Sequence, residues 1–322
     1  MSIILGIDIG ATNIRVAAAD LNGNILLKHS EKTVRESGIG VVDQVIRISD
    51  TVLSSLKLRR GDVKSIGIGS IGPLDLKKGL IVNPPNLKVG IIPIVEAIGK
   101  YFKVPVRLLN DCVAAVLGEK RFGAGRNLEN IVYITISTGI GCGAIVDGHL
   151  LLGKDGNAHE IGHTVVDKDG LLTCGCGKRG HWEAYCSGRG IINYSRILLE
   201  EWDVEFDKCS LSKYSQGDIS KMTSETLFKA AREGDEVALK IMDKVGLLNA
   251  IGFANAIEAY DPELITVGGS VALYNSEIIL KPVREKVSEY AMNRLPEIVI
   301  TPLGEDIVLY GALAAAIEAF SN

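Results

Sequence analysis

Two glycine-rich turns in matching surroundings constrain the fold more than any other feature of this sequence. Asp8-Ile9-Gly10-Ala11-Thr12 ends one β-like apolar run, and Ser137-Thr138-Gly139-Ile140-Gly141 ends another. Each turn is followed by a second β-like run and then by Asn22-Gly23 or Asp147-Gly148. Such pairs favour hairpins because both turn positions take positive φ. We therefore expect two antiparallel β-meanders of one design, as an internal duplication would produce.

The rest of the chain alternates between helical and strand-like periodicity. Helices are predicted over residues 38–57, 94–102 and 311–320, and a helix-rich stretch with a polar break over 191–248. Strands are predicted over residues 63–69, 104–109, 264–267 and 298–301, and a loop over 72–85. This order predicts two α/β lobes that share a cleft.

Charge and hydropathy exclude several classes of partner. The 322 residues include 39 acidic and 35 basic side chains of well-mixed sign, so nothing indicates binding to nucleic acid or to an anionic membrane. Residues 131–146, the longest uncharged apolar stretch, are too few and too polar for a membrane helix of roughly 20 apolar residues. The first residues lack the basic segment and cleavage site of a signal peptide. We expect a cytoplasmic protein with small, soluble ligands.

One glycine pattern suggests a different function. Gly67-Ile68-Gly69-Ser70-Ile71-Gly72 spells the dinucleotide-binding fingerprint after a strand. That fingerprint requires a helix that begins within it, because the helix N-terminus holds the pyrophosphate. Pro73, Pro84 and Pro85 argue against such a helix, and the sequence contains no GxxxxGK[ST] phosphate loop. Dehydrogenase and P-loop functions are therefore disfavoured.

The two hairpin turns offer a better phosphate site. Their glycines let backbone N–H groups approach phosphate oxygens, and nearby hydroxyl and amide side chains add donors. The glycines are Gly10, Gly139, Gly141 and Gly143, and the side chains are Thr12, Asn13 and Thr138. Asp8 is placed to orient a Mg²⁺ ion through water. The alternative is that both are only tight β-turns, but their symmetric duplication favours the phosphate interpretation.

These segments carry a family resemblance. The two turns and residues 264–270 resemble the two phosphate segments and the adenosine segment of the actin, Hsp70 and sugar-kinase superfamily. His159-Glu160-Ile161-Gly162-His163, followed by Cys174-Gly-Cys176-Gly-Lys-Arg-Gly180-His181-Trp-Glu183, resembles the signature of the ROK family (repressors, open reading frames and kinases). The resemblance extends over essentially the whole chain.

The resemblance implies both a fold and an activity. The fold is the two-lobed, actin-like (ribonuclease H-like) α/β ATPase with duplicated β-meanders and a central cleft. Residues 1–110 plus 308–322 would form the small lobe, and residues 111–307 the large lobe with the sugar signature. The activity is ATP- and Mg²⁺-dependent phosphorylation of a hexose, with glucose at its 6-hydroxyl favoured. We also expect a homodimer or higher homo-oligomer.

Two alternatives stay open at this point. One is a ROK kinase for N-acetylmannosamine, N-acetylglucosamine, fructose or allose, because these enzymes share the signature. The other is a non-catalytic sugar sensor that kept the fold. Asp111 and both phosphate turns favour an enzyme, since a sensor need not keep a base. ROK repressors also carry a helix-turn-helix before the first turn, whereas Asp8 lies too near the start of this sequence for one.

The resemblance also assigns roles to residues. Asp111 follows a short strand and matches the catalytic base, whereas the residues alone favour a role in capping the next helix; the two roles are compatible. The implied sugar ligands are Gly72, Asn86, Asn110, Asp111, Glu160, His163 and Glu183. The implied nucleotide and phosphate ligands are Asp8, Gly10, Ala11, Thr12, Asn13, Thr138, Gly139, Gly141, Gly268, Gly269 and Ser270. Lys88-Val89-Gly90 departs from the family's proline-glycine-tryptophan beside Asn86.

A small zinc site is the last implied feature. Cys174 and Cys176, with His163 before them and His181 after them, have the spacing of a structural zinc site. Most ROK kinases have a third cysteine at position 181, but neutral histidine is also a good zinc ligand. The alternatives are a metal-free loop, or a disulfide between two of Cys174, Cys176 and Cys186.

Overall fold

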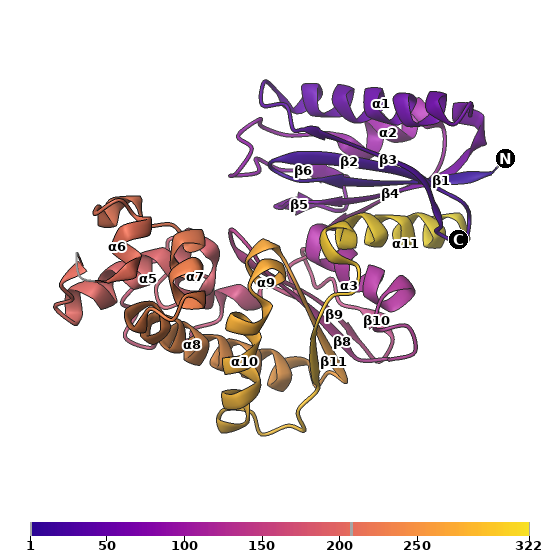
Figure 1. The fold of residues 1–322 in the computed structure, drawn as a ribbon. Coiled ribbons are helices and arrows are strands. Elements are labelled where there is room, and N and C mark those ends of the chain that lie inside the picture. The colour runs from indigo at the N-terminus through magenta and orange to yellow at the C-terminus, as the bar shows by residue number, and fades with distance from the viewer. Residues whose placement is uncertain (1, 207–208, 322) are drawn as a thin grey trace. The chain divides into compact units, whose positions relative to one another are not determined.

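Two five-stranded sheets with the same strand order form the framework of the protein (Figure 1). The computed structural model describes residues 2–206 and 209–321. The first sheet has the order β3-β2-β1-β4-β7 and the second the order β10-β9-β8-β11-β12, so each is an antiparallel meander extended on one side. In the first sheet, β4 lies parallel to β1 and β7 parallel to β4. The predicted duplication of the meander is confirmed.

The strand bounds match the predicted runs closely. The first sheet contains β1 (Ile3–Ile9), β2 (Asn13–Ala19), β3 (Ile25–Lys32), β4 (Val63–Ser70) and β7 (Val106–Asn110). The second contains β8 (Ile131–Ile136), β9 (Ile140–Val146), β10 (His149–Leu150), β11 (Leu264–Gly268) and β12 (Glu297–Ile300). The predicted loop over 72–85 includes a short hairpin of β5 (Leu74–Asp75) and β6 (Leu80–Ile81).

The chain divides into two compact units. The first comprises residues 1–133, 143–159 and 301–322, and the second residues 134–142 and 160–300. β8 and β9 pass from one unit into the other. This division places residues 111–133 in the first unit, whereas the lobes expected from sequence placed them in the second; the lobe boundaries stay a prediction.

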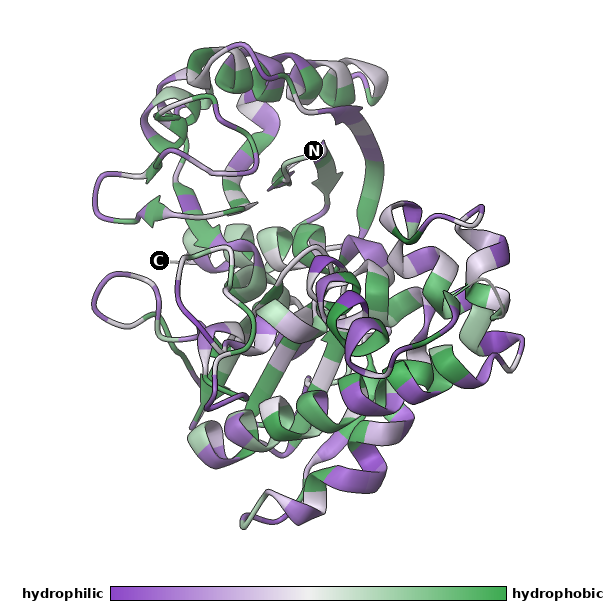
Figure 2. Cartoon of the chain, turned by 90° about the vertical axis from the view of Figure 1, so that its left-hand side faces the viewer, coloured by the Kyte–Doolittle hydropathy of each residue, from purple (hydrophilic) through white to green (hydrophobic). Residues whose placement is uncertain are grey.

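The first sheet is covered by helices on both faces (Figure 1). α1 (Gly38–Ser55) and α2 (Ile94–Phe102) cover one face, and α3 (Asp111–Phe122) and α11 (Ile307–Ser321) cover the other. Every residue of β1 is buried, and its side chains alternate between the faces: Ile3 and Leu5 pack toward α1, and Ile4 packs toward α11. α1 shows the apolar and polar bands of an amphipathic helix in Figure 2.

The glycines of the dinucleotide-like pattern serve packing. A Cβ on Gly67 would overlap the carbonyl oxygen of Ala312 on α11, and one on Gly69 would lie 2.6 Å from Cγ1 of Val308. β4 is followed by β5 and not by a helix. These glycines let α11 approach the sheet closely, and the structure lacks the helix that a pyrophosphate site requires.

We expect Gly67→Ala to lower the free energy of unfolding by about 3 kcal/mol, because the added methyl forces α11 away from β4. Gly61→Ala is the matched control, since a Cβ on Gly61 meets nothing within 4 Å. Urea unfolding of both variants measures the difference. Equal stability of the two would contradict the close approach of α11.

The second unit is mainly helical around its part of the second sheet. Its helices are α4 (Trp182–Cys186), α5 (Gly188–Glu201), α6 (Ser210–Tyr214), α7 (Ser224–Arg232), α8 (Glu236–Tyr260), α9 (Ser270–Tyr274) and α10 (Ser276–Lys286). α10 was not predicted; it contains Pro282, whose ring packs where Gly246 of α8 leaves room. Within the described residues, no helix is both long and apolar enough to cross a membrane.

Candidate active site

The first glycine-rich turn joins β1 to β2 and is fixed by its own backbone. The N–H of Gly10 donates to the carbonyl of Asn13 at 3.0 Å. The carbonyl of Gly10 accepts from Oγ1 of Thr33 at 2.8 Å. The N–H of Thr33 donates to the carbonyl of Thr12 at 2.9 Å. Because the carbonyls of Gly10 and Thr12 are tied to Thr33, the turn is held from the β3 side. The Thr12 side chain remains exposed to solvent.

Asp8 is a buried carboxylate beside this turn. It lies directly opposite Arg15 in the β1–β2 register, and Nη1 of Arg15 donates to its Oδ2 at 2.9 Å. Burial raises the pKa of Asp8 to about 6; Arg15 opposes the rise, and the nearby charges of Asp111 and Asp306 add to it. Asp306 also pairs with Lys28, at 2.6 Å.

The carboxylates near Asp8 are of the kind that Mg²⁺ prefers. Mg²⁺ binds proteins through one or two carboxylates and keeps several waters and phosphate oxygens. The charges of Asp111 and Asp306 both add to the rise in the pKa of Asp8, so all three carboxylates belong to one electrostatic neighbourhood.

We expect Asp8→Asn to stabilise the nucleotide-free and magnesium-free protein increasingly as pH rises from 4 to 7. A carboxyl whose folded pKa is raised from 3.8 to about 6 binds its proton more tightly when folded, so stability is lost as pH rises through this window. Because the asparagine variant does not titrate, its stability relative to wild type should rise by about 2–3 kcal/mol across this range. Urea unfolding across this pH range provides the measurement. A constant difference would contradict the raised pKa.

Asn110 and Asp111 lie where β7 meets α3. Asn110 ends the strand and caps the helix, since its Oδ1 accepts from the N–H of Cys112 at 2.9 Å. Asp111 is the first residue of the helix, and its Oδ1 accepts from the same N–H at 2.8 Å. Asn110 is therefore the N-cap residue of α3, and Asp111 shares the hydrogen bond from Cys112.

Two further predicted sugar ligands lie in loops of the same unit. A Cβ on Gly72 would lie 3.7 Å from Nδ2 of Asn110, so this glycine is a neighbour of the Asn110 side chain. Asn86 is exposed, and its carbonyl accepts from Arg35 at 3.3 Å. The other end of the Arg35 guanidinium donates to the carbonyl of Ala11 at 3.0 Å. Arg35, which was not predicted, thus links the Asn86 loop to the first turn.

The second glycine-rich turn is bound at both ends. The N–H of Gly188 donates to the carbonyl of Ser137 at 2.7 Å, and Oε2 of Glu183 accepts from the N–H of Ile140 at 3.0 Å. Gly141 continues into β9. Gly143 lies deeper in that strand, where a Cβ would overlap the carbonyl of Cys112, so packing against α3 explains this glycine.

The predicted adenosine segment adjoins the second turn. β11 ends at Gly268, and Gly269 has φ +84° at the start of α9. A Cβ on Gly269 would lie 2.5 Å from the carbonyl oxygen of Ile136, so only glycine fits. Oγ of Ser270 lies 3.2 Å from Oγ of Ser137. The two segments are therefore adjacent, as expected of parts of one nucleotide site.

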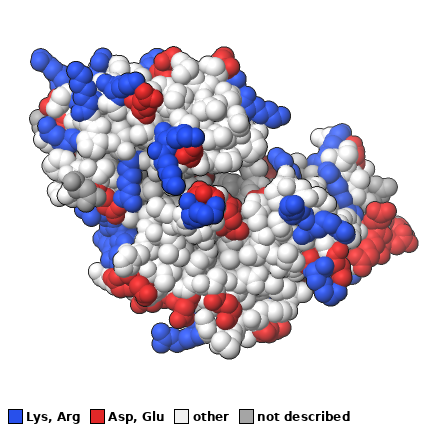
Figure 3. Space-filling model, turned by 180° about the vertical axis from the view of Figure 1, so that it is seen from behind, with Lys and Arg blue, Asp and Glu red and all other residues white. Residues whose placement is uncertain are grey.

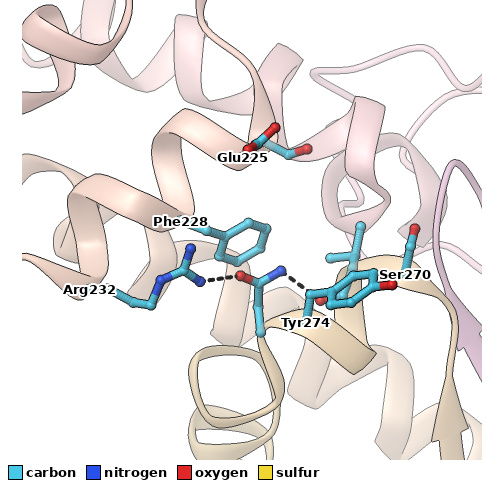
Figure 4. A pocket seen from close by; sticks show the side chains of 8 residues that line it. Glu225, Phe228, Arg232, Ser270 and Tyr274 are labelled. Carbon is cyan, nitrogen blue, oxygen red and sulfur yellow. Dashed lines mark hydrogen bonds between the residues drawn. The ribbon is translucent and has the colours of Figure 1, made fainter. Parts of the chain in front are cut away.

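A pocket of about 430 Å³ opens from Ser270 between α7 and α9 (Figure 4). Phe228 and Arg232 of α7 form one wall, and Tyr274 of α9 lies on the other. Arg232 donates to Oδ1 of Asn275 at 2.6 Å, and Nδ2 of Asn275 donates to the carbonyl of Val271. Aromatic rings beside a few fixed polar groups are typical of a site for a planar ligand.

The predicted zinc ligands gather in the second unit. The ligand atoms of His163, Cys174, Cys176 and His181 all lie within 4.8 Å of one another. Sγ of Cys174 is 3.7 Å from Nδ1 of His163, and Sγ of Cys176 is 3.3 Å from Nδ1 of His181. With Zn–S near 2.3 Å and Zn–N near 2.0 Å, a tetrahedral ion separates sulfur and nitrogen ligands by about 3.5 Å. The cluster therefore fits zinc.

The electrostatics of the cluster also suit a metal. Burial, with a smaller contribution from His163, lowers the pKa of His181, so its ring is neutral and able to ligate at neutral pH. Burial raises the pKa of the Cys174 thiol to about 12 in the metal-free protein. Bound zinc would instead lower the pKa of this thiol, because a thiol that coordinates a metal loses its proton. All six cysteines, which lie among the described residues, have free thiols, and Cys186 donates instead to the carbonyl of Val245.

Glu160 and Glu183 lie beside this cluster. Oε2 of the exposed Glu160 is 3.7 Å from Nε2 of His163, so Nδ1 of this ring faces Cys174 while Nε2 faces a carboxylate. A carboxylate on the far nitrogen is the usual support of a metal-bound histidine. Oε1 of Glu183 accepts from Sγ of Cys174 at 3.4 Å. The structure thus brings three of the predicted sugar ligands into one part of the second unit.

Comparison with known proteins identifies the family. The ROK family profile matches residues 4–318. The chain belongs to the ROK family. It is 39% identical over 316 residues to a glucokinase of Pyrobaculum calidifontis, which covers 98% of this chain and 95% of the relative. As a ROK protein it also has the fold of the actin-like sugar kinases.

Two solved structures support this assignment. The ROK family glucokinase of Streptomyces griseus, solved with glucose and AMPPNP, aligns with a TM-score of 0.78 and 31% identity over 98% of this chain and 100% of that one. The ROK hexokinase of Thermus thermophilus aligns with a TM-score of 0.83 and 28% identity over 99% of this chain and 100% of that one.

Several residues of the site were missed from sequence. Arg15 was within reach of sequence reasoning, because a hairpin with the turn at 10–12 places it opposite Asp8. Arg35 lies between β3 and α1, and Asp306 ends a short 3-10 helix before α11, so neither gives a periodic signal. Phe228 and Arg232 line the pocket from a helix far from Ser270 in the sequence, and only the tertiary structure joins them.

Proposed function

We propose that this protein is an ATP- and Mg²⁺-dependent glucokinase that transfers the γ-phosphoryl group to the 6-hydroxyl of glucose. The observation that carries the proposal is the Asp111 carboxylate, at the start of α3 and close enough to Asp8 to raise its pKa. Asp111 and the first glycine-rich turn belong to the same unit, which supports a role for Asp111 as the base. The near full-length similarity to the Pyrobaculum glucokinase supports the same activity.

In the proposed reaction, Asp111 accepts the proton of the sugar 6-hydroxyl as its oxygen attacks the γ-phosphorus. The bond from the γ-phosphorus to the bridging oxygen breaks, and ADP leaves. Little covalent chemistry falls to the protein, so its contributions are orientation and stabilisation of charge. The backbone N–H groups of the two turns, with Thr12, Asn13 and Thr138, donate to the phosphates. Mg²⁺, when bound beside Asp8, neutralises phosphate charge.

The sugar is proposed to bind through the signature residues. Glu160 and Glu183 each accept hydrogen bonds from hydroxyls, and His163 and Asn110 add further contacts, with Gly72 and Asn86 from the loops. A site built for hydroxyl groups rejects analogues that lack them, because a buried partner left unpaired costs about 1–3 kcal/mol. Zinc would be held by His163, Cys174, Cys176 and His181 and would fix this segment. A zinc-bound Cys174 is a thiolate that donates no hydrogen bond, so Oε1 of Glu183 is then open to a sugar hydroxyl.

The nucleoside is proposed to bind beside residues 268–270. There the pocket between Phe228 and Tyr274 has room for a planar base, and Arg232 borders it. Sugar and nucleotide are therefore the partners of the site. Basic and acidic side chains lie interspersed on the face in Figure 3, which suits small ligands better than a polyanion. A cytoplasmic homodimer or higher homo-oligomer completes the proposal, and light scattering tests the assembly.

Coupled measurement of ADP release across a panel of sugars tests the activity. Glucose should give the highest kcat/KM among glucose, fructose, allose, N-acetylglucosamine and N-acetylmannosamine. A better rate with another of these sugars would establish a different ROK kinase. Sugar binding by calorimetry without ADP release from any of them would overturn the kinase proposal in favour of a sensor.

A further inference from the structure

One short segment of the second unit, residues 183–188, holds the second glycine-rich turn at both ends. Glu183 Oε2 accepts from the N–H of Ile140, where the chain leaves the turn, at 3.0 Å. The N–H of Gly188 donates to the carbonyl of Ser137, where the chain enters it, at 2.7 Å. Both partners in the turn are backbone groups. The turn is also closed by its own hydrogen bond, from the N–H of Ser137 to the carbonyl of Gly139 at 2.9 Å, and the segment adds two bonds that hold the closed turn in place.

The fit between this segment and the turn is close. A Cβ on Gly139 would lie 2.5 Å from Oε2 of Glu183, and one on Gly188 would lie 3.2 Å from the carbonyl oxygen of Ser137. No side chain can be added on either side without moving the carboxylate or the turn. The shape of the turn thus depends on the position of Glu183.

The segment is itself anchored in the interior. Trp182, the neighbour of Glu183, is fully buried, and its Nε1 donates to Oδ1 of Asn249 on α8 at 2.9 Å. Its ring packs edge-on against Phe253, with ring centroids 5.5 Å apart. Because α8 fixes Trp182, Glu183 starts from a rigid backbone and its carboxylate has little freedom to leave the turn.

The two oxygens of Glu183 face different parts of the unit. Oε2 accepts a hydrogen bond from Ile140 of the turn. Oε1 accepts one from Sγ of Cys174, a predicted zinc ligand, at 3.4 Å. One carboxylate therefore touches both the phosphate turn and the segment proposed to bind sugar. The bond from Ile140 to Oε2 is made without any sugar.

We propose that Glu183 is a positioning residue for the second phosphate turn, which it holds in the shape that binds nucleotide even when no sugar is present. The inference rests on the proposed function, because it requires that the turn bind phosphates. It goes beyond the sugar-ligand role that the family resemblance implies. That role alone predicts no effect of Glu183 on nucleotide binding by the sugar-free protein.

Calorimetric titration with AMPPNP and Mg²⁺ in the absence of sugar tests the proposal. Glu183→Ala should weaken AMPPNP binding about tenfold or more, because a charge-assisted hydrogen bond to the turn is lost. Glu183→Asp keeps the charge but is too short to reach Ile140, and should weaken binding similarly. Glu183→Gln keeps a carbonyl oxygen for that N–H and should stay within about threefold of wild type. Glu200→Ala, which removes a carboxylate from the exposed surface of α5 in the same unit, should leave the affinity unchanged.

Amide hydrogen exchange supplies a second readout. The peptide that covers residues 137–141 should exchange faster in Glu183→Ala and Glu183→Asp than in wild type, and the Gln variant should remain protected. Wild-type affinity and protection in Glu183→Ala and Glu183→Asp would overturn the positioning role while the kinase proposal stands. Failure of the wild-type protein to bind AMPPNP would overturn the proposed function, and this inference with it.

Discussion

Asp111→Asn is expected to lower kcat by about 10²- to 10⁴-fold while the affinity for glucose changes little, because a general base acts mainly in the transition state. The amide is nearly the same size as the carboxylate and keeps an oxygen for the N–H of Cys112, so the start of α3 should be preserved. Steady-state ADP release and calorimetric glucose binding give the two quantities separately.

The control for this experiment is Asp43→Asn, which makes the same chemical change on the exposed surface of α1. It should leave both quantities unchanged. A fall in glucose affinity of Asp111→Asn as large as the fall in kcat would assign Asp111 to ground-state binding. Near-normal turnover would exclude it as the base.

Removal of zinc is expected to have the second largest effect. The purified protein should contain about one equivalent of zinc, and chelation should lower Tm by at least about 5 °C. The apparent affinity for glucose should fall about tenfold, because the ion fixes the segment that carries His163 and Glu183. Elemental analysis, differential scanning calorimetry and glucose titration measure the three effects.

Substitutions at position 181 make this test specific. His181→Ala should lose zinc, whereas His181→Cys should retain it, since thiolate is also a good ligand. Cys209→Ser is the control, because Sγ of Cys209 donates to the carbonyl of Phe206 and lies outside the cluster. Metal-free protein with full stability and activity would contradict the zinc assignment and leave the kinase proposal intact.

The β-structure was predictable because its signals are local. A β-like run, a glycine-rich turn and an Asn-Gly or Asp-Gly pair define each meander without reference to the rest of the chain. α10 was missed because Pro282 normally ends a helix; here Gly246 on another helix makes room for its ring. α11 begins at Ile307, four residues before the predicted start at 311. This start was missed because no side-chain cap marks the preceding turn at Leu303.

The site was predictable where residues follow a strand. Asp8, Asp111 and Gly268 each lie at or next to a strand end, the place where α/β folds gather ligands. The sequence could not show which side-chain and backbone atoms already make hydrogen bonds within the protein. The N–H of Cys112 serves both Asn110 and Asp111, and Glu183 is engaged with Ile140 before any ligand binds. Such shared hydrogen bonds depend on tertiary distances that no spacing reports.

Because α11 packs on the first sheet, this sheet cannot be completely covered until the end of the chain has been synthesised. The ribosome makes β1 and β4 early, but it makes α11 only after the whole of residues 160–300. Translation proceeds at about 5–20 residues per second. The apolar face that contains Ile4 and Ala19 therefore stays uncovered for at least about ten seconds, until Leu313 and Ala316 have been synthesised. The first unit therefore matures after translation of the second, and a nascent chain interrupted before α11 presents a sheet face open to aggregation and to chaperones.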